Sequence, residues 1–340
     1  MRRSRHTIEY FAAWLLYVMF ALLPLDWASG LGGWIGRTFG PNLRVSNNAR
    51  RNLKLTFPDW NDEKVEQTVL AMWDNLGRTA GEHPHLSAFD PYQKNSRVDV
   101  VGAEYCDLLK GNEKPGLFFA GHIGNWEISP LAGTRRGLTV HLVYRRANNP
   151  FFDRLVQKGR DALDGDLYPK GPEGAKSIIR ALKRGDNMAM LVDQKMNDGV
   201  PVPFLGREAM TAPAVAELAL RYKCPVVPAR VERLKGAYFR VTFYPPLDRP
   251  DKGDKQQNIL AMMTEINRQL GDWIKENPVN FHINEFIPIQ QVIGSLGNYF
   301  PLFYYLIYKV NIPIIFGIYC YCSITHHCLR PCRGYSNFFI

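Results

Sequence analysis

Cysteine is scarce over most of this 340-residue chain. Between residues 1 and 278 only Cys106 and Cys224 occur, which excludes a disulfide framework there and indicates a reduced, cytosol-facing domain. The other four cysteines crowd into the last 21 residues beside two histidines, but their spacing fits no zinc pattern. We therefore expect no bound metal and no disulfide in the body of the protein.

Long hydrophobic runs are lacking as well. The most apolar stretch of the amino-terminal half, from Phe11 to Leu25, would form a helix about 22 Å long, which is short of the ~30 Å hydrocarbon core of a bilayer. No small-residue cleavage site follows it, so we predict a retained membrane anchor over residues 1–36. Because arginines precede the run, a spanning helix would place the body outside the cell, whereas a helix lying in the interface would not.

Acidic residues are outnumbered, with 32 Asp and Glu against 42 Lys and Arg, a formal net charge of +10. This surplus indicates an acidic partner, which can be nucleic acid, anionic lipid, a phosphorylated substrate or an acidic carrier protein. The first 60 residues combine eight basic and three acidic residues with the apolar run, which favours a membrane surface. No helix-turn-helix, ribonucleoprotein motif or aromatic-basic platform is present, so no nucleic acid is expected.

Strand and helix patterns alternate from residue 61 onward, and this predicts an α/β fold. Asn61 is expected to cap the first helix of this region, and an amphipathic helix over about 256–276 closes it before Asn277 and Pro278. Beyond Pro278 the composition changes, because Glu285 is the only acid and apolar residues dominate. We therefore separate an atypical hydrophobic tail, residues 279–340, in which a second membrane segment is conceivable.

The most informative segment, residues 116–128, reads GLFFAGHIGNWEI. It predicts a buried strand, a turn with two glycines, and a helix over 125–135. Positions five apart on a helix differ by about 140°, so His122 must lie in the turn for Glu127 to reach one of its ring nitrogens. Such a carboxylate would fix the tautomer while the other nitrogen takes a proton from a hydroxyl. Backbone N–H groups at the helix start would then stabilise an oxyanion.

This spacing alone does not decide between a catalytic pair and a buried histidine beside a turn. His85 also has an acid five positions on, Asp90, but no strand precedes it and prolines surround it. We therefore interpret that second match as a loop.

Further segments follow His122 in a characteristic order. They are GHIGNWE at 121–127, VYRRANNPFFD at 143–153, the Gly159-Arg160 pair, ALKRGD at 181–186, LVDQ at 191–194 and VPFLGREAMTAPAVAELALR at 202–221. With them the chain resembles, over roughly residues 8–278, the bacterial lipid A biosynthesis late acyltransferases (lauroyl or myristoyl transferases) of the lysophospholipid acyltransferase-like superfamily. The resemblance implies a mixed sheet flanked by helices, the glycerolipid acyltransferase-like fold, with an acyltransferase domain over residues 37–278.

The resemblance also implies a reaction and its partners. An acyl chain would pass from an acyl carrier protein to a hydroxyl of a phosphorylated, acylated glucosamine disaccharide, a lipid A precursor, on the cytoplasmic side of the bacterial inner membrane. No metal or redox cofactor is implied. The positive charge of the chain suits both partners, since carrier proteins and lipid A precursors are acidic.

Site residues follow from the matched motifs. By the resemblance His122 and Glu127 are the catalytic pair, and Arg160 and Asp193 occupy the remaining charged positions of the site. Arg160 suits a bidentate contact with a phosphate, and Asp193, at the end of an apolar strand, can orient Arg160 or Gln194.

Two further substrate-binding positions come from the 143–153 segment. The resemblance places Arg145 and Asn149 beside the acceptor or the donor.

The carboxyl end departs from the family pattern. Relatives usually continue past Asn-Pro with a tryptophan-rich segment of the His-Arg-Arg-Trp type, and residues 279–340 contain nothing similar. A reading-frame change near the codons for Pro278 to Phe281 would explain this. Two other functions stay open: acylation of another lipid, such as a phosphatidylinositol mannoside or a glycerolipid, and a membrane-attached lipid-binding role without catalysis.

Overall fold

The structure is a computed structural model, and it describes residues 2–110, 115–147 and 149–281. The expectations for the tail beyond residue 281, including the cysteine cluster and a second membrane segment, lie outside the described residues. The positions at the end of the body, up to Phe281, are described and pack against the sheet.

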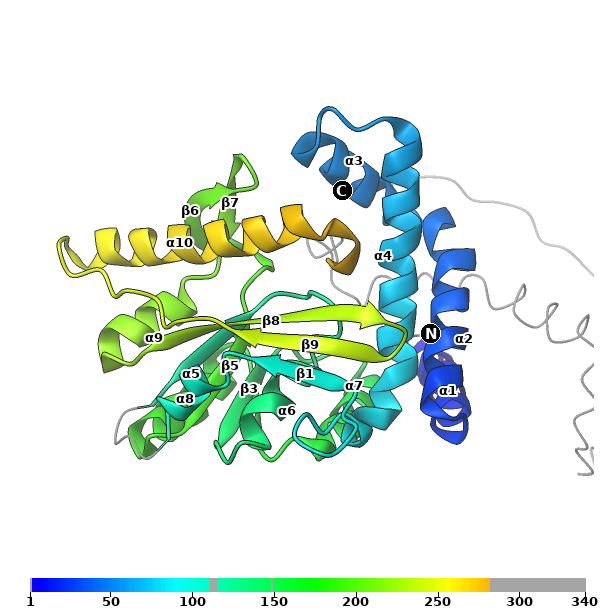
Figure 1. Cartoon of the computed structure of the whole chain (residues 1–340), viewed down its shortest axis with the longest axis horizontal. Coiled ribbons are helices and arrows are strands. Elements are labelled where there is room, and N and C mark those ends of the chain that lie inside the picture. The colour runs from blue at the N-terminus through cyan, green and yellow to red at the C-terminus, as the bar shows by residue number, and fades with distance from the viewer. Residues whose placement is uncertain (1, 111–114, 148, 282–340) are drawn as a thin grey trace, which may run out of the picture. The chain divides into compact units, whose positions relative to one another are not determined.

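A seven-stranded sheet forms the centre of the fold (Figure 1). Its strand order is β1-β9-β8-β2-β5-β3-β4, and every neighbouring pair is parallel except the antiparallel β8–β9 hairpin. The strands are β1 (Val98–Val101), β2 (Leu117–Ala120), β3 (Val140–Tyr144), β4 (Leu167–Pro169), β5 (Asn187–Leu191), β8 (Val226–Lys235) and β9 (Tyr238–Phe243). The predicted mixed sheet is confirmed.

Helices cover both faces of this sheet. The α-helices of the described residues, of which α1 and α2 pack on other helices, are α1 (Arg2–Leu22), α2 (Leu25–Phe39), α3 (Ser46–Thr56), α4 (Asp62–Glu82), α5 (Glu104–Asp107), α6 (Ile128–Thr134), α7 (Pro150–Gly159), α8 (Pro172–Arg184), α9 (Ala214–Tyr222) and α10 (Lys255–Glu276). Every residue of β2 is buried, as in a strand covered on both sides. Leu117 and Phe119 pack into one core cluster with α9 and α10, and Phe118 and Ala120 into the other with α6.

Two predicted helix boundaries are correct and have the expected physical cause. The side chain of Asn61 accepts a hydrogen bond from the backbone N–H of Lys64 at 2.9 Å and so caps α4. The closing helix, α10, follows a capping box made by Asp254 and Gln257. The predicted helix over 125–135 is wrong at its start, because α6 begins only at Ile128 and residues 125–127 form a turn.

A two-stranded antiparallel hairpin, β6 (Lys195–Phe204) and β7 (Arg207–Thr211), stands apart from the main sheet and packs on α10. No strand was expected here, and Pro201 and Pro203 are unusual within strands. Both turn residues, Leu205 and Gly206, have positive φ, as a two-residue hairpin turn requires. The sequence signal for this hairpin is the Leu205-Gly206 pair, which forms the two-residue turn between the strands.

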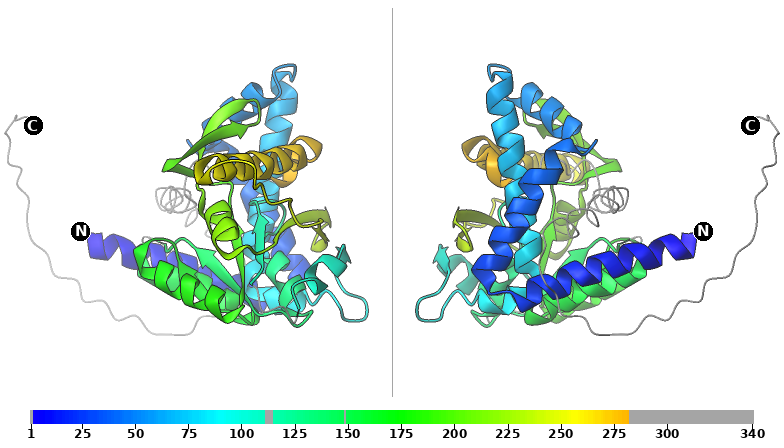
Figure 2. Two further views of the ribbon diagram at one scale, coloured as in Figure 1. Left: turned by 90° about the vertical axis from the view of Figure 1, so that its left-hand side faces the viewer. Right: turned by 90° about the vertical axis from the view of Figure 1, so that its right-hand side faces the viewer.

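The amino-terminal segment forms two helices separated by Pro24. Within the described residues no helix has the length and apolar character needed to cross a bilayer, so the spanning form of the predicted anchor is not supported. Helix α2 lies beside α4 (Figures 1 and 2), where a Cβ atom on Gly32 would come within 2.2 Å of the carbonyl oxygen of Gly77. Glycine is required there because the two backbones touch.

Candidate active site

Two polar side chains of the candidate site, His122 and Asp193, follow the carboxyl ends of parallel strands, where open α/β sheets bind their ligands. His122 lies two residues after Ala120, the end of β2, and Asp193 lies two residues after Leu191, the end of β5. These two strands are neighbours, and Ala120 is paired directly with Leu191. The register of the sheet therefore brings His122 and Asp193 together, although 71 residues separate them.

The contact between these two residues is a double one. Nδ1 of His122 lies 2.8 Å from Oδ1 of Asp193, and the backbone N–H of His122 donates to Oδ2 at 2.6 Å. Burial by itself raises the pKa of the Asp193 carboxyl, but the charge and hydrogen bonds of His122 outweigh it and hold this pKa below its usual value. An ionised Asp193 accepts the Nδ1 proton, so the lone pair of the imidazole lies on Nε2.

Glu127 has a different partner. Nε of Arg160 donates to its Oε2 at 2.8 Å and Nη2 donates to its Oε1 at 2.6 Å, while the indole N–H of Trp126 donates to Oε1 at 3.1 Å. Burial raises the pKa of Glu127, but the Arg160 guanidinium and these hydrogen bonds have the larger, opposite effect and lower the pKa from 4.5 to about 2. Both members are almost wholly buried, with side-chain exposures of 7% and 12%, and form a fully ionised bidentate pair.

The expected pairing of His122 with Glu127 is thus corrected. The carboxylate on the imidazole belongs to Asp193, and Glu127 bonds to Arg160 instead. Asp193 was expected to orient Arg160 or Gln194, and it orients His122. The physical reason is that strand register fixes the His122 backbone, whereas the turn directs Glu127 toward α7. Trp126 links the two pairs, because its ring meets that of His122 edge-on at 4.8 Å and its N–H reaches Glu127.

The predicted oxyanion donors at the helix start are largely engaged within the protein. The backbone N–H of Ile123 donates to the Gly121 carbonyl, that of Gly124 to the Asn280 carbonyl and that of Ile128 to the Asn125 carbonyl. The backbone N–H of Glu127 donates to the Asn125 side chain. These four groups therefore serve the loop itself, and the expectation that they stabilise an oxyanion is wrong for them.

The predicted substrate-binding residues lie near the same ends of the strands. Arg145 is exposed directly after β3. Asn149 is buried, and its side chain accepts the N–H of Phe151 as the N-cap of α7. Gln194 is half-buried, and its Oε1 accepts from Lys170 at 3.3 Å. Contact of these residues with a substrate stays a prediction.

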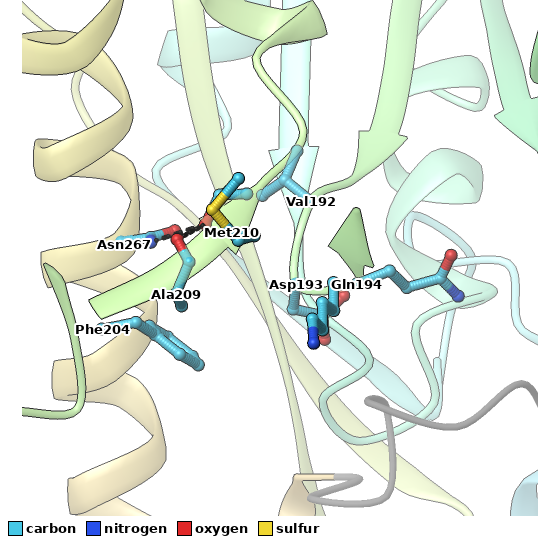
Figure 3. Close-up of a pocket in the computed structure, with 9 residues that line it drawn as sticks. Val192, Asp193, Gln194, Phe204, Ala209, Met210 and Asn267 are labelled. Carbon is cyan, nitrogen blue, oxygen red and sulfur yellow. Dashed lines mark hydrogen bonds between the residues drawn. The ribbon is translucent and has the colours of Figure 1, made fainter. Parts of the chain in front are cut away.

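A small cavity of about 10 Å³ adjoins Asp193, between the end of β5, the β6–β7 hairpin and α10 (Figure 3). Its lining is Val192, Asp193, Gln194, Lys195, Phe204, Ala209, Met210, Thr211 and Asn267. In Figure 3 Asp193 and Gln194 lie on one side and the hairpin side chains on the other, and Asn267 donates to Thr211 at 3.1 Å. The hairpin that the sequence analysis missed therefore forms one wall beside the candidate site.

His83 is a further residue of this region, and no motif of the sequence pointed to it. It ends α4, and its Nε2 lies 3.0 Å from the carbonyl oxygen of Val156 in α7. Burial lowers its pKa, although the nearby Glu127 carboxylate acts in the other direction, so the ring is neutral and donates to that carbonyl. A Cβ on Gly159 would lie 2.2 Å from this nitrogen, so glycine is needed just before Arg160.

The geometry suits general-base chemistry. A buried imidazole is oriented by an ionised acid, and a second, separate ion pair lies next to it. Within the described segments no group of three or more His, Cys, Asp or Glu side chains is arranged to hold a metal ion.

Comparisons with known proteins agree with the motif resemblance. The family model described as bacterial lipid A biosynthesis acyltransferase matches residues 1–283. A lipid A biosynthesis myristoyltransferase of Escherichia coli (strain K12) is 25% identical over 277 residues, covering 77% of this chain and 83% of that protein. A lipid A biosynthesis acyltransferase of Haemophilus influenzae is 26% identical over 248 residues, covering 69% of this chain and 75% of that protein. The family match ends close to where the composition of the sequence changes.

Proposed function

Because the chain belongs to the bacterial lipid A biosynthesis acyltransferase family, we propose that it transfers an acyl group from an acyl carrier protein to a hydroxyl of a lipid A precursor, with His122 as the general base. The family and the names of the relatives make the chain an acyltransferase of lipid A biosynthesis. The donor, the acceptor hydroxyl and the base are the parts that we propose.

The proposed reaction needs one base and one path for its proton. Nε2 of His122 takes the proton of the acceptor hydroxyl, and the hydroxyl oxygen bonds to the thioester carbonyl carbon. The C–S bond then breaks, and the leaving thiolate receives the proton from Nε2. Asp193 holds the Nδ1 proton throughout and offsets the positive charge of the imidazolium. A positioned base of this kind contributes roughly 10²–10⁴ in rate.

The observation that carries this proposal is the contact of Nδ1 of His122 with a buried, ionised Asp193. Without that carboxylate the ring could carry its proton on either nitrogen, and Nε2 would not be fixed as the acceptor. Since the contact follows from the register of β2 and β5, it is built into the sheet.

The positive groups of the site suit anionic reactants. Glu127 compensates the charge of Arg160, so this pair holds α7 against the turn at residues 125–127. We assign the main contact with an acceptor phosphate to Arg145, which is exposed. The part of the Arg160 guanidinium that is not buried makes a weaker contact. Asn149 supports substrate binding by capping the start of α7. We also assign a substrate contact to Gln194, which lines the cavity beside Asp193.

We further propose that the protein works at the cytoplasmic surface of the bacterial inner membrane, with α1 and α2 lying in the interface. Large apolar side chains of these helices are exposed, among them Leu22 at 80%, Trp27 at 71% and Phe11 at 63%. Tryptophan is typical of the membrane–water boundary, and the net charge favours anionic lipid. Flotation with vesicles of anionic and of zwitterionic lipid tests this, and equal recovery without either kind of vesicle contradicts it.

The function is tested by measuring acyl transfer from a carrier-protein thioester and from a coenzyme A thioester to a panel of lipid acceptors. His122→Ala is expected to lose at least about 10² in rate with its fold retained. The matched control is His85→Ala, since His85 has an acid at the same spacing and bonds to a helix carbonyl instead.

Three outcomes separate the open functions. Transfer only to a glycerolipid or an inositol mannoside moves the activity to another acceptor. Equal activity of His122→Ala and the unaltered protein contradicts the proposed base. Lipid binding without transfer of the acyl group contradicts catalysis.

A further inference from the structure

A buried network of polar side chains lies behind the loop at residues 121–127. Glu82, at the end of α4, is fully buried, and Arg233 of β8 donates to both of its carboxylate oxygens. Oε1 of Glu82 also accepts from Oγ of Ser29 at 2.7 Å, and Oε2 accepts from Nδ2 of Asn125 at 2.9 Å. Each oxygen thus receives two donors, and one of these four donors belongs to the loop.

The same arginine reaches the loop by a second route. Its Nε donates to Oδ1 of Asn75 at 2.7 Å, and Nδ2 of Asn75 donates to the carbonyl of Gly124 at 3.1 Å. The Asn75 amide is therefore oriented on one side by Arg233 and holds the loop on the other. Gly124 has a φ of +62°, and a Cβ there would lie 2.6 Å from the carbonyl oxygen of Val231, so the loop is confined from the sheet side as well.

Asn125 passes this constraint on to the active site. Its Nδ2 donates to Glu82, and its Oδ1 accepts the backbone N–H of Glu127 at 3.3 Å. The carboxylate of Glu127 then bonds to Arg160. A continuous series of contacts thus runs from the buried Arg233–Glu82 pair, through Asn125, to a charged pair of the site.

We propose that Glu82 and Arg233 are positioning residues for acyl transfer, which set the conformation of the loop through Asn125 and Asn75. Because buried ion pairs are seldom needed for stability, a pair of apolar side chains could fill the volume of Glu82 and Arg233. It would leave the amides of Asn125 and Asn75 without these partners, and nothing would fix the loop. The inference rests on the proposed function in using acyl transfer as its measurement.

The test is an exchange of the two groups that meet at the loop. Asn125→Asp sets a second carboxylate against Glu82, and Glu82→Gln leaves the charge of Arg233 uncompensated. Each is expected to lower kcat at least about tenfold while KM changes less than about threefold. The double variant Glu82→Gln/Asn125→Asp restores one carboxylate and one amide with the hydrogen bond reversed, while the new amide nitrogen faces Nη2 of Arg233, so kcat should recover in part, to at least about threefold above the lower of the two single variants.

A purely structural role predicts a different pattern. Thermal unfolding would shift in every variant, and kcat per folded molecule would stay constant. The matched control is Ser29→Ala, which removes a bond to the same carboxylate on the α2 side and does not touch the loop. It is expected to lower the unfolding temperature and to leave kcat unchanged.

Two results overturn the proposal: both single variants keep kcat within about twofold, or the folded double variant fails to recover. If Asn125→Asp does not fold, Asn125→Ala replaces it, since this variant removes both bonds without adding a charge. Folded Asn125→Ala with the original kcat also overturns the proposal. Running His122→Ala in the same assay keeps the two hypotheses apart, because activity in that variant contradicts the proposed base whatever the loop variants do.

Discussion

Two buried histidines lie at opposite ends of the same sheet, and each contacts a carboxylate. His122 follows β2 at the carboxyl ends of the strands and has Asp193 on Nδ1. His141 lies near the start of β3, and its Nε2 is 3.2 Å from Asp186, just before β5. Nδ1 of His141 accepts the backbone N–H of Asp166 at 2.9 Å. The lone pair of His141 is therefore on Nδ1, where it accepts a backbone N–H, whereas that of His122 is on Nε2, opposite the nitrogen that contacts Asp193.

This contrast shows which features separate the proposed base from a buried structural histidine. Burial is alike, since both residues are 5% exposed, and both have an acid. What differs is the ring nitrogen that carries the lone pair and the end of the sheet at which the ring lies. Ligands of open α/β sheets bind beyond the carboxyl ends of strands, where His122 is. At the amino end of the sheet His141 connects the segments that precede β4 and β5, through Asp166 and Asp186.

The largest expected effect comes from removing the acid that orients His122. Asp193→Asn should lower kcat by about 10²–10⁴, because an amide can orient the ring in the wrong tautomer and does not offset its charge. Acyl-transfer rates, with circular dichroism as a check of the fold, measure it. A folded Asp193→Asn protein within about tenfold of the original rate would show that the two histidines do not differ as described.

The second prediction concerns acid stability at the carboxyl end of the sheet. The pKa of Glu127 is lowered from 4.5 to about 2, so the folded state binds this proton less readily than the unfolded state. The stabilisation is complete above pH 4.5 and is lost as the pH falls from 4.5 through 2. It amounts to about 3 kcal/mol, given 1.36 kcal/mol for each pKa unit.

Glu127→Gln tests this value. The variant should be less stable than the unaltered protein by about 3–5 kcal/mol at pH 7, because it leaves Arg160 buried without a counter-charge. Urea unfolding from pH 7 to pH 3 should show the difference shrinking toward low pH. The titration of Asp193 cancels in this comparison, since both proteins contain it. A difference that does not change with pH would contradict the assigned pKa.

A smaller effect is expected from the close packing behind Arg160. Gly159→Ala would set a Cβ 2.2 Å from Nε2 of His83, which should cost about 1–3 kcal/mol of unfolding free energy. The control is Gly30→Ala in α2, where nothing lies within 4 Å and helix propensity favours alanine by up to about 1 kcal/mol. Urea unfolding of both variants at pH 7 measures the contrast, and equal stabilities would contradict it.

The sequence predicted the parts of the site better than their pairing. The strand before His122, the turn that holds it and the strand before Asp193 follow from local patterns of apolar residues and glycine. Their contact depends on β2 and β5 being neighbours, which is a property of strand order that no local pattern contains. Glu127 was paired with His122 because the two are close in sequence. The structure pairs it with Arg160 at the end of α7, whose guanidinium is always charged, whereas an imidazole is not.

Other parts of the fold were not predicted, for similar reasons. The β6–β7 hairpin contains Pro201 and Pro203, and it tolerates them because, among the described residues, no third strand pairs with its outer edges. The network around Glu82 draws on α2, α4 and β8, so its members share no motif. By contrast, the closing helix α10 was predicted because its amphipathic pattern and its stop at Asn277 are local.

The smallest effect is expected at the other histidine. In His141→Gln the new amide can donate to Asp186 and its oxygen can accept the backbone N–H of Asp166, so both contacts survive in part. The loss of ring packing against Tyr168, whose centroid is 5.1 Å away, should cost about 1–2 kcal/mol, and kcat should stay within about twofold. Thermal unfolding and acyl transfer measured on one preparation separate these effects. A tenfold loss of kcat with the fold intact would mean that the amino end of the sheet also takes part in catalysis, and the contrast between the two histidines would fail.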